Sequence, residues 1–130
     1  MSSLLDGAAQ AASGMRAQAL RLRLSAENIA NADTPGYRRK LTSFQAVVED
    51  GRPTGEVAAG RVHLDRAEAE RIWDPGNPLS GPDGFRTGSN VDLGIEIADA
   101  REAQRSYEAN LRIFDQVRQM SRDLLAILKR

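Results

Sequence analysis

The side chains that most often carry out chemistry are few in this 130-residue sequence, and they do not combine into a site. Glu68 and Glu70 form a carboxylate pair among arginines, which is typical of a solvated surface rather than of general acid–base catalysis. His63 is the only histidine and there is no cysteine, so neither a histidine cluster nor a cysteine-based zinc site can form. We expect His63 to be an exposed strand residue.

The segment after Asp74 has the acidic residues of a calcium loop but not their spacing. The third, fifth and twelfth positions counted from Asp74 are Gly76, Pro78 and Phe85, and none supplies a side-chain oxygen. The sequence also lacks glycine-rich phosphate loops and the paired-histidine helix motif of zinc proteases. We therefore expect no catalytic residue, no metal and no cofactor, and a role in binding or assembly.

The elements that would position functional residues begin with a long helix, predicted from Ser3 to about Asn31. Its apolar residues alternate spacings of three and four, the heptad pattern of a coiled-coil seam. This first seam consists of Leu5, Ala8, Ala12, Met15, Ala19, Leu22, Ala26 and Ile29. The segment Thr34-Pro35-Gly36 then predicts a turn, because Pro fixes one φ angle and Gly allows a positive φ at the next position.

A second helix is predicted to run to Leu128 from Asn90 or Asp92, either of which can cap its N-terminus. Its seam consists of Ala100, Ala103, Tyr107, Leu111, Phe114, Val117, Met120, Leu124 and Ile127. This seam is bulky where the first is small, so we expect the two helices to pack as an antiparallel hairpin. That pairing would place Leu5 near Leu125 and Ile29 near Ala100.

The segment between the helices is rich in Gly and Pro and contains short alternating runs. Strands are predicted over Thr42–Glu49, Glu56–Leu64 and Ala69–Trp73, with a loop over 74–89. The predicted fold is therefore mainly α with a small β insertion, the terminal helices forming an antiparallel, coiled-coil-like hairpin. It divides into an N-terminal helix and turn (1–36), a small β and loop segment (37–89) and a C-terminal helix (90–130).

Composition suggests that this fold completes its core with partners. The apolar fraction is 41%, but 19 of the apolar residues are Ala and only six are aromatic. A chain of this length with so few large apolar side chains is poorly supplied for an independent globular core. We therefore expect an elongated protein that packs against other chains.

The charges balance overall, with 18 basic and 18 acidic residues, which argues against a nucleic-acid partner. The two ends are nevertheless basic and the middle is acidic, so opposite charges could meet between subunits and fix their axial register. The triplet Arg38-Arg39-Lys40 is predicted to be either a solvated strand entry or a contact for an acidic patch on a neighbouring protein.

No apolar run is long enough to span a membrane, and the N-terminus does not resemble a secretory signal, which by itself indicates a cytosolic protein.

One stretch resembles a known signature. Residues Ser25 to Tyr37, SAENIANADTPGY, are similar to the N-terminal signature of the bacterial flagellar axial proteins. Two further stretches, WDPGNPL at 73–79 and RSYEAN at 105–110, together with Asn90-Val91-Asp92 and Glu96, resemble the C-type proximal rod subunits of the basal body. This resemblance covers nearly the whole chain, although Ile97 and Trp73 depart from the residues usual in the family.

The resemblance implies a structural subunit whose terminal helices form the inner layer of a helical tube around the export channel. It implies rod subunits as partners, including copies of itself, together with the adaptor and membrane ring at the rod base. It also implies secretion by the flagellar type III export apparatus without a cleaved signal, and assembly in the periplasm. The periplasmic location that the resemblance implies then replaces the cytosolic interpretation. Neither nucleic-acid binding nor direct membrane insertion is expected.

The resemblance also assigns residues to the family motif and to subunit contacts. They are Asn28, Ile29, Asn31, Thr34, Pro35, Gly36, Tyr37, Asp74, Pro75, Asn77, Pro78, Asn90, Val91, Asp92, Glu96, Arg105, Tyr107 and Asn110. Asn28 and Asn31 are expected to bond across helix ends and to neighbouring subunits, since an amide both donates and accepts. The alternatives are a sibling B-type rod subunit and a soluble helical-hairpin adaptor.

Overall fold

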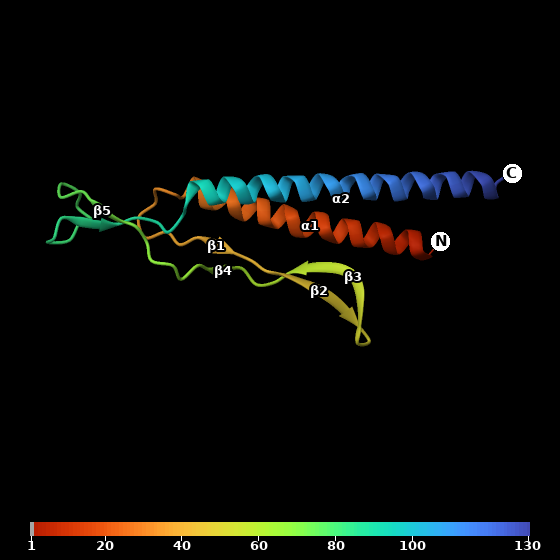
Figure 1. Cartoon of the computed structure of the whole chain (residues 1–130), viewed down its shortest axis with the longest axis horizontal. Coiled ribbons are helices and arrows are strands. Elements are labelled where there is room, and N and C mark those ends of the chain that lie inside the picture. The colour runs from red at the N-terminus through yellow and green to blue at the C-terminus, as the bar shows by residue number, and fades with distance from the viewer. Residues whose placement is uncertain (1) are drawn as a thin grey trace. The chain divides into compact units, whose positions relative to one another are not determined.

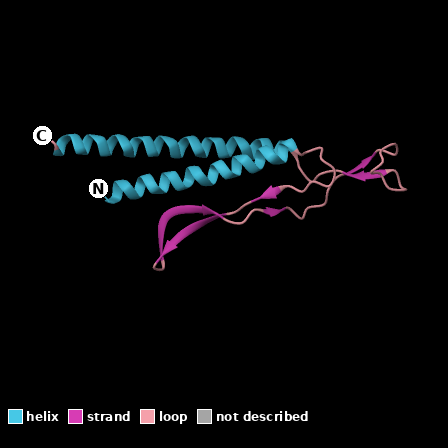
Figure 2. Ribbon diagram, turned by 180° about the vertical axis from the view of Figure 1, so that it is seen from behind, coloured by secondary structure: helices cyan, strands magenta, loops and turns pink. Residues whose placement is uncertain are grey.

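The computed structural model describes residues 2–130, which form two long helices with short strands between them. The element order is α1 (Ser2–Ala30), β1 (Lys40–Leu41), β2 (Phe44–Glu49), β3 (Arg52–Ala59), β4 (His63–Leu64), β5 (Arg71–Trp73), β6 (Phe85–Thr87) and α2 (Leu93–Leu128). Figure 1 labels most of these elements, and Figure 2 shows the ribbon from behind. The predicted fold class, paired terminal helices around a small β region, is confirmed.

The strands form three separate antiparallel pairs, β1 with β4, β2 with β3, and β5 with β6. The prediction of one strand over Glu56–Leu64 is wrong, because β3 ends before Gly60 and β4 pairs with a different strand. The predicted loop over 74–89 contains β6, a strand too short to stand out among Gly and Pro residues. The β2–β3 turn is Asp50-Gly51, both with positive φ angles, as a tight hairpin requires.

Contacts divide the chain into two compact units. The first unit contains residues 1–20, 43–60 and 102–130, and the second contains 21–42 and 61–101. The first therefore holds the β2–β3 hairpin with one part of each helix, and the second holds the other two strand pairs with the remaining parts.

In each unit the two helices meet along a line that differs from the predicted first seam. In the first unit, a Cβ on Gly7 would lie 3.6 Å from Val117 Cγ2, and one on Gly14 would lie 2.8 Å from the Asn110 amide. In the second unit, Arg21 pairs with Asp99 and Asn28 bonds Glu96. Each of these α1 contact residues lies two positions after a residue of the predicted seam. At Gly7 and Gly14 the absence of a side chain allows the two helices to approach closely.

The predicted seam of α1 is open only in part, since Ala8, Ala12, Met15, Leu22 and Ile29 are half-buried. Leu5 is 66% exposed, and Ala19 and Ala26 are exposed as well. On α2 the prediction was better: Ala103 is buried, and Tyr107, Phe114, Val117 and Leu124 are half-buried. Leu111 and Met120 were wrongly placed in the helix contact, since both are exposed while Asn110 and Ser121 are half-buried beside them.

The predicted helix register is also wrong. Gly7 lies opposite Val117, whereas the expected pairing of Leu5 with Leu125 would have placed residue 123 there. Two antiparallel helices advance by the same rise per residue, so the start of α1 at Ser2 lies about opposite Arg122. The last residues of α2, Leu124 to Leu128, consequently extend beyond the described start of α1.

Candidate functional site

The TPG turn directs the chain away from α1. The backbone N–H of Tyr37 donates to the Thr34 carbonyl at 3.1 Å, and Gly36 has a φ of 73°. With Pro35 before this glycine, the turn has the pattern of a type II turn. Asn31 supports it, because its Oδ1 accepts from the Thr34 hydroxyl at 3.0 Å while its Nδ2 donates to the Glu27 carbonyl at 2.8 Å. Asn31 therefore bonds within its own helix end and turn.

Asn28 is the centre of the contacts beyond this turn. It is 1% exposed, and all four hydrogen bonds that its amide can make are formed. Oδ1 accepts from the Tyr37 hydroxyl at 2.8 Å and from the Lys40 N–H at 2.9 Å. Nδ2 donates to the Lys40 carbonyl at 3.0 Å and to Glu96 Oε1 at 3.2 Å. One side chain thus joins α1, the residue after the turn, β1 and α2.

Arg39 brings three carboxylates of its own chain together. Its guanidinium bonds Glu96 through Nε, lies 2.9 Å from Asp99 Oδ2 and lies 3.7 Å from Asp65 Oδ2. Burial disfavours the Arg39 charge, but the hydrogen bond and charge of Glu96, with those of Asp99 and Asp65, raise its pKa overall. Glu96 is 1% exposed, and a carboxylate so buried needs such a partner.

Asn90, just before the start of α2, also forms hydrogen bonds in this region. Its Oδ1 accepts from the backbone N–H of Arg39 at 2.6 Å. Its Nδ2 donates to the backbone carbonyls of Asp65 and Ala67, both at 3.1 Å. Asp92 then caps α2, since its Oδ1 accepts from the N–H groups of Gly94 and Ile95. The prediction of Asp92 as a helix cap is confirmed.

We call the cluster of Asn28, Tyr37, Arg39, Glu96 and Asp99 the polar junction. Burial raises the pKa of Tyr37, so its hydroxyl remains a hydrogen-bond donor to Asn28. Each member of the junction bonds another member, which makes the cluster a rigid connection rather than a reactive site. Among residues 2–130, no group of acidic or histidine side chains is arranged to hold a metal.

The interpretation of the basic triplet at 38–40 is wrong for Arg39 and Lys40, whereas Arg38 is exposed as a solvated strand entry would be. Arg39 lies in the polar junction and Lys40 bonds Glu27 at 3.0 Å, so neither is a solvated strand entry or waits for a neighbouring protein's acids. The Glu27 hydrogen bond and charge raise the pKa of Lys40. Sequence reasoning missed the role of Arg39 because its partners Glu96 and Asp99 lie more than fifty residues away in the chain.

The WDPGNP loop folds over the β5–β6 pair. Asp74 accepts hydrogen bonds from Asn77 Nδ2 at 3.1 Å and from Arg86 Nε at 3.3 Å, which ties the loop to β6. The rings of Trp73 and Phe85 meet edge to face, with their centroids 5.2 Å apart. Pro75 and Pro78 are exposed in this loop, and His63 in β4 is exposed as predicted.

The RSYEAN stretch lies on α2 away from the polar junction. Arg105 is exposed and makes no ion pair among the described residues, whereas Tyr107 is half-buried. Asn110 is half-buried, donates to the Ser106 carbonyl at 2.9 Å and lies against Gly14 of α1. The apolar side chains of Val91 and Ile29 are half-buried.

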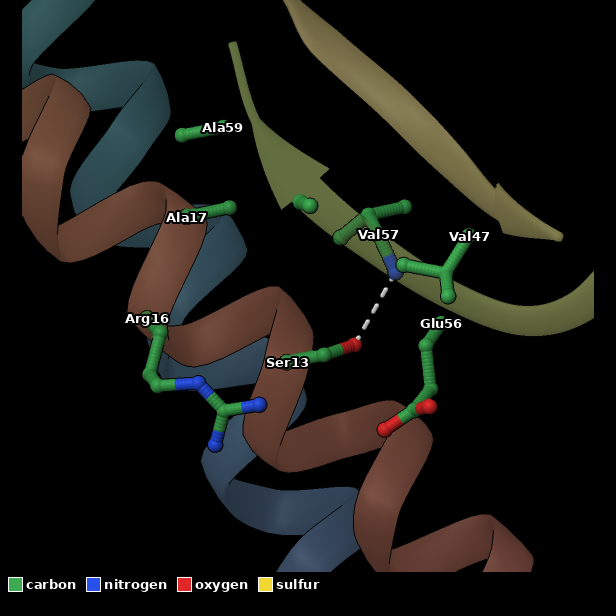
Figure 3. Close-up of a pocket in the computed structure, with 8 residues that line it drawn as sticks. Ser13, Arg16, Ala17, Val47, Glu56, Val57 and Ala59 are labelled. Carbon is green, nitrogen blue, oxygen red and sulfur yellow. Dashed lines mark hydrogen bonds between the residues drawn. The ribbon is translucent and has the colours of Figure 1, made fainter. Parts of the chain in front are cut away.

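A second polar contact, which the sequence did not reveal, holds the β2–β3 hairpin on α1. Gln10 Nε2 donates to the Thr54 carbonyl at 3.0 Å, and Ser13 Oγ accepts from the Val57 N–H at 3.1 Å. Figure 3 shows Ser13 pointing from α1 toward Val57 beside a groove of about 310 Å³. Serine and glutamine inside a helix gave no signal of this contact, because such residues are usually solvated.

Comparisons with known proteins show which proteins the chain is similar to. Residues 10–38 match the family "Flagella basal body rod protein", and residues 83–127 match "Flagellar basal body rod FlgEFG protein C-terminal". The chain is 40% identical to the flagellar basal-body rod protein FlgC of Agrobacterium fabrum, covering 92% of this chain and 91% of the relative. It is 35% identical to FlgC of Salmonella typhimurium (85% and 87% covered) and 28% identical to FlgC of Bacillus subtilis (91% and 93% covered).

Proposed function

This chain belongs to the FlgC family of flagellar basal-body rod proteins, and on that premise we propose how its own residues serve the rod. It is a structural subunit of the proximal rod rather than an enzyme, and it assembles with other rod and basal-body components. No helix among residues 2–130 is long and apolar enough to cross a membrane.

We propose that the two terminal segments, 1–36 and 90–130, form the inner layer of the rod around the export channel, and that 37–89 faces outward. The polar junction is the observation that carries this proposal. It ties the end of α1, the residue after the TPG turn, β1 and the start of α2 through buried bonds of Asn28 and Arg39. A subunit that transmits torque needs such a connection, since a loose one would absorb rotation instead of passing it on.

The open seam of α1 supplies the contact that a neighbouring subunit would fill. A heptad spacing favours a helix as partner, and Leu5, Ala19 and Ala26 are exposed in the described part of the chain. Leu111 and Met120 offer exposed apolar side chains on α2 in the same way. We propose that these residues pack against helices of adjacent rod subunits, including other copies of this chain.

We further propose that the subunit is secreted by the flagellar type III export apparatus and assembles in the periplasm. There it would contact the adaptor and membrane ring at the base of the rod. Family membership supports this, since a subunit of the rod must reach the rod before it can be incorporated.

The test replaces each of two exposed alanines on α1 by glutamate, in separate variants. Ala19 lies on the open seam and Ala9 lies outside it, and both are exposed. In a strain lacking the chromosomal copy, Ala19→Glu should abolish incorporation into isolated basal bodies, while Ala9→Glu should leave incorporation and swimming intact. Far-ultraviolet circular dichroism should show equal helix content in both variants. Full incorporation of Ala19→Glu would refute the seam contact, and absence of the wild-type chain from basal bodies would refute the rod role.

A further inference from the structure

The β2–β3 hairpin carries an acidic and apolar surface without a partner in its own unit. Residues 43–60 contain three acids, Glu49, Asp50 and Glu56, against one base, Arg52. Within the described chain, none of these four residues forms an ion pair. Val48 is 55% exposed beside them, and Phe44 is also exposed. Exposed apolar side chains beside unpaired charges of net negative sign are typical of an interaction surface.

This surface is held in a defined orientation. Gln10 and Ser13 anchor β3 to α1 through the Thr54 carbonyl and the Val57 N–H, as Figure 3 shows for Ser13. Gly55 permits the Gln10 contact, because a Cβ at Gly55 would lie 2.5 Å from Gln10 Nε2. The hairpin tip at Asp50-Gly51 is therefore presented by a fixed support rather than by a free loop.

The end of α2 carries the opposite charge and no partner. Leu124 to Leu128 extend beyond the described start of α1, and Ile127 and Leu128 are 65% and 68% exposed. Arg122, Lys129 and Arg130 surround them with one acid, Asp123, among them. Within the described chain, none of the three bases forms an ion pair.

We propose that the basic, apolar end of α2 in one copy of this chain docks on the acidic, apolar hairpin surface of a second copy. The two surfaces match in both charge and apolar character, and the charged side chains of each form no ion pair within residues 2–130. This proposal rests on the proposed rod function, and it identifies one contact between copies of the chain within the rod. Because it joins two different surfaces head to tail, its repetition generates a ring or a helical array, as a rod requires.

The choice of a second copy follows from the charges. An anionic lipid or nucleic acid would satisfy the basic helix end and would be repelled by the hairpin. Only a partner that carries both surfaces satisfies both, and a second copy is that partner. Opposite charges at the two surfaces also set the register in which copies meet.

A charge exchange tests the contact. The variants are Lys129→Glu/Arg130→Glu, Glu49→Lys/Asp50→Lys, and the combination of all four substitutions, in the purified full-length chain. Self-association is measured by sedimentation velocity at about 0.05 M and 0.5 M salt. We expect each double variant to weaken self-association at least tenfold at low salt, and the combination to recover to within about threefold of wild type. Arg61→Glu/Arg66→Glu, of equal charge change outside both surfaces, should have no effect.

A second measurement addresses the assembled rod. Because the chain has no cysteine, one copy carrying Asp50→Cys and another carrying Lys129→Cys can be expressed together. Oxidation of isolated basal bodies should give a disulfide-linked dimer only when both variants are present. No dimer, with both variants incorporated, would overturn the docking contact while leaving the rod function standing. Failure of the wild-type chain to enter basal bodies would instead overturn the rod function.

Discussion

The side-chain amide of Asn28 pairs with both backbone groups of Lys40 as a neighbouring strand would, accepting from its N–H and donating to its carbonyl. Through this contact the last turn of α1 fixes the first residue of β1. The same amide bonds Tyr37 and Glu96, so the direction of the chain after the TPG turn is tied to the start of α2.

Asn28→Ala should destabilise the protein by about 3 kcal/mol, because it leaves the Lys40 backbone groups and the Tyr37 hydroxyl short of partners in a buried place. Urea unfolding followed by circular dichroism measures this loss. Asn31→Ala is the control, since Asn31 bonds only its own helix end and turn, and it should cost about 1 kcal/mol. Equal losses in the two variants would contradict the central place of Asn28.

Arg39→Met should cost about 3–5 kcal/mol, since it leaves the buried carboxylate of Glu96 without its cation. Arg39→Met combined with Glu96→Met should cost less than the sum of the two single losses, because the double variant removes both charges. The measurement is a double-mutant cycle of unfolding free energies. Additive losses would show that the two groups do not interact.

Gly7→Ala should stabilise the protein by about 1 kcal/mol, the difference in helix propensity, because its Cβ meets Val117 at an ordinary 3.6 Å. Gly14→Ala should not give this gain, since its Cβ would lie 2.8 Å from the Asn110 amide, which bonds the Ser106 carbonyl. Thermal unfolding of the two variants side by side measures the difference. A gain at both positions would mean that Asn110 moves without cost.

The tip of the β5–β6 pair should change conformation at acid pH. The Phe85 N–H and the Arg71 guanidinium lower the pKa of Asp83 below its ordinary 3.8. The stabilisation from Asp83 is therefore present above pH 3.8 and is lost as pH falls through the lower folded value. Trp73, the single tryptophan, contacts Phe85 and reports this change by fluorescence.

We expect the Trp73 emission to shift below about pH 4 in the wild type, and this acid step to shrink in Asp83→Asn. Asp83→Asn leaves the bond between Asp74 and Arg86 in place, so the difference between the two proteins isolates Asp83. An identical acid step in the two proteins would count against the Asp83 contribution.

Arg105→Glu should leave unfolding free energy within about 0.5 kcal/mol of wild type, because Arg105 is exposed and makes no ion pair in the described chain. It should nevertheless impair rod assembly while secretion continues, if Arg105 contacts a neighbouring subunit. Swimming in soft agar and immunoblots of secreted protein measure the two effects. Normal motility would rule out that contact.

Local sequence was enough to predict the helices and the turn between α1 and β1. Heptad spacing, the Asp92 cap and the order Thr34-Pro35-Gly36 act over a few neighbouring residues, and the structure follows them. The family signature around Asn28 and Tyr37 also pointed to the right part of the chain. Such signals are read correctly because their physical causes are local.

Tertiary structure decided which faces meet and what the charges do. Apolarity alone favoured Leu5 and Ala19 as the helix contact, but glycines at 7 and 14 allow a closer approach, so Leu5 and Ala19 remain exposed. Arg39 stands in a plain basic triplet, and only the fold places Glu96 and Asp99 around it. The sequence by itself determined a paired-helix rod subunit, whereas the register of the helices and the polar junction depend on contacts between residues that are distant in the chain.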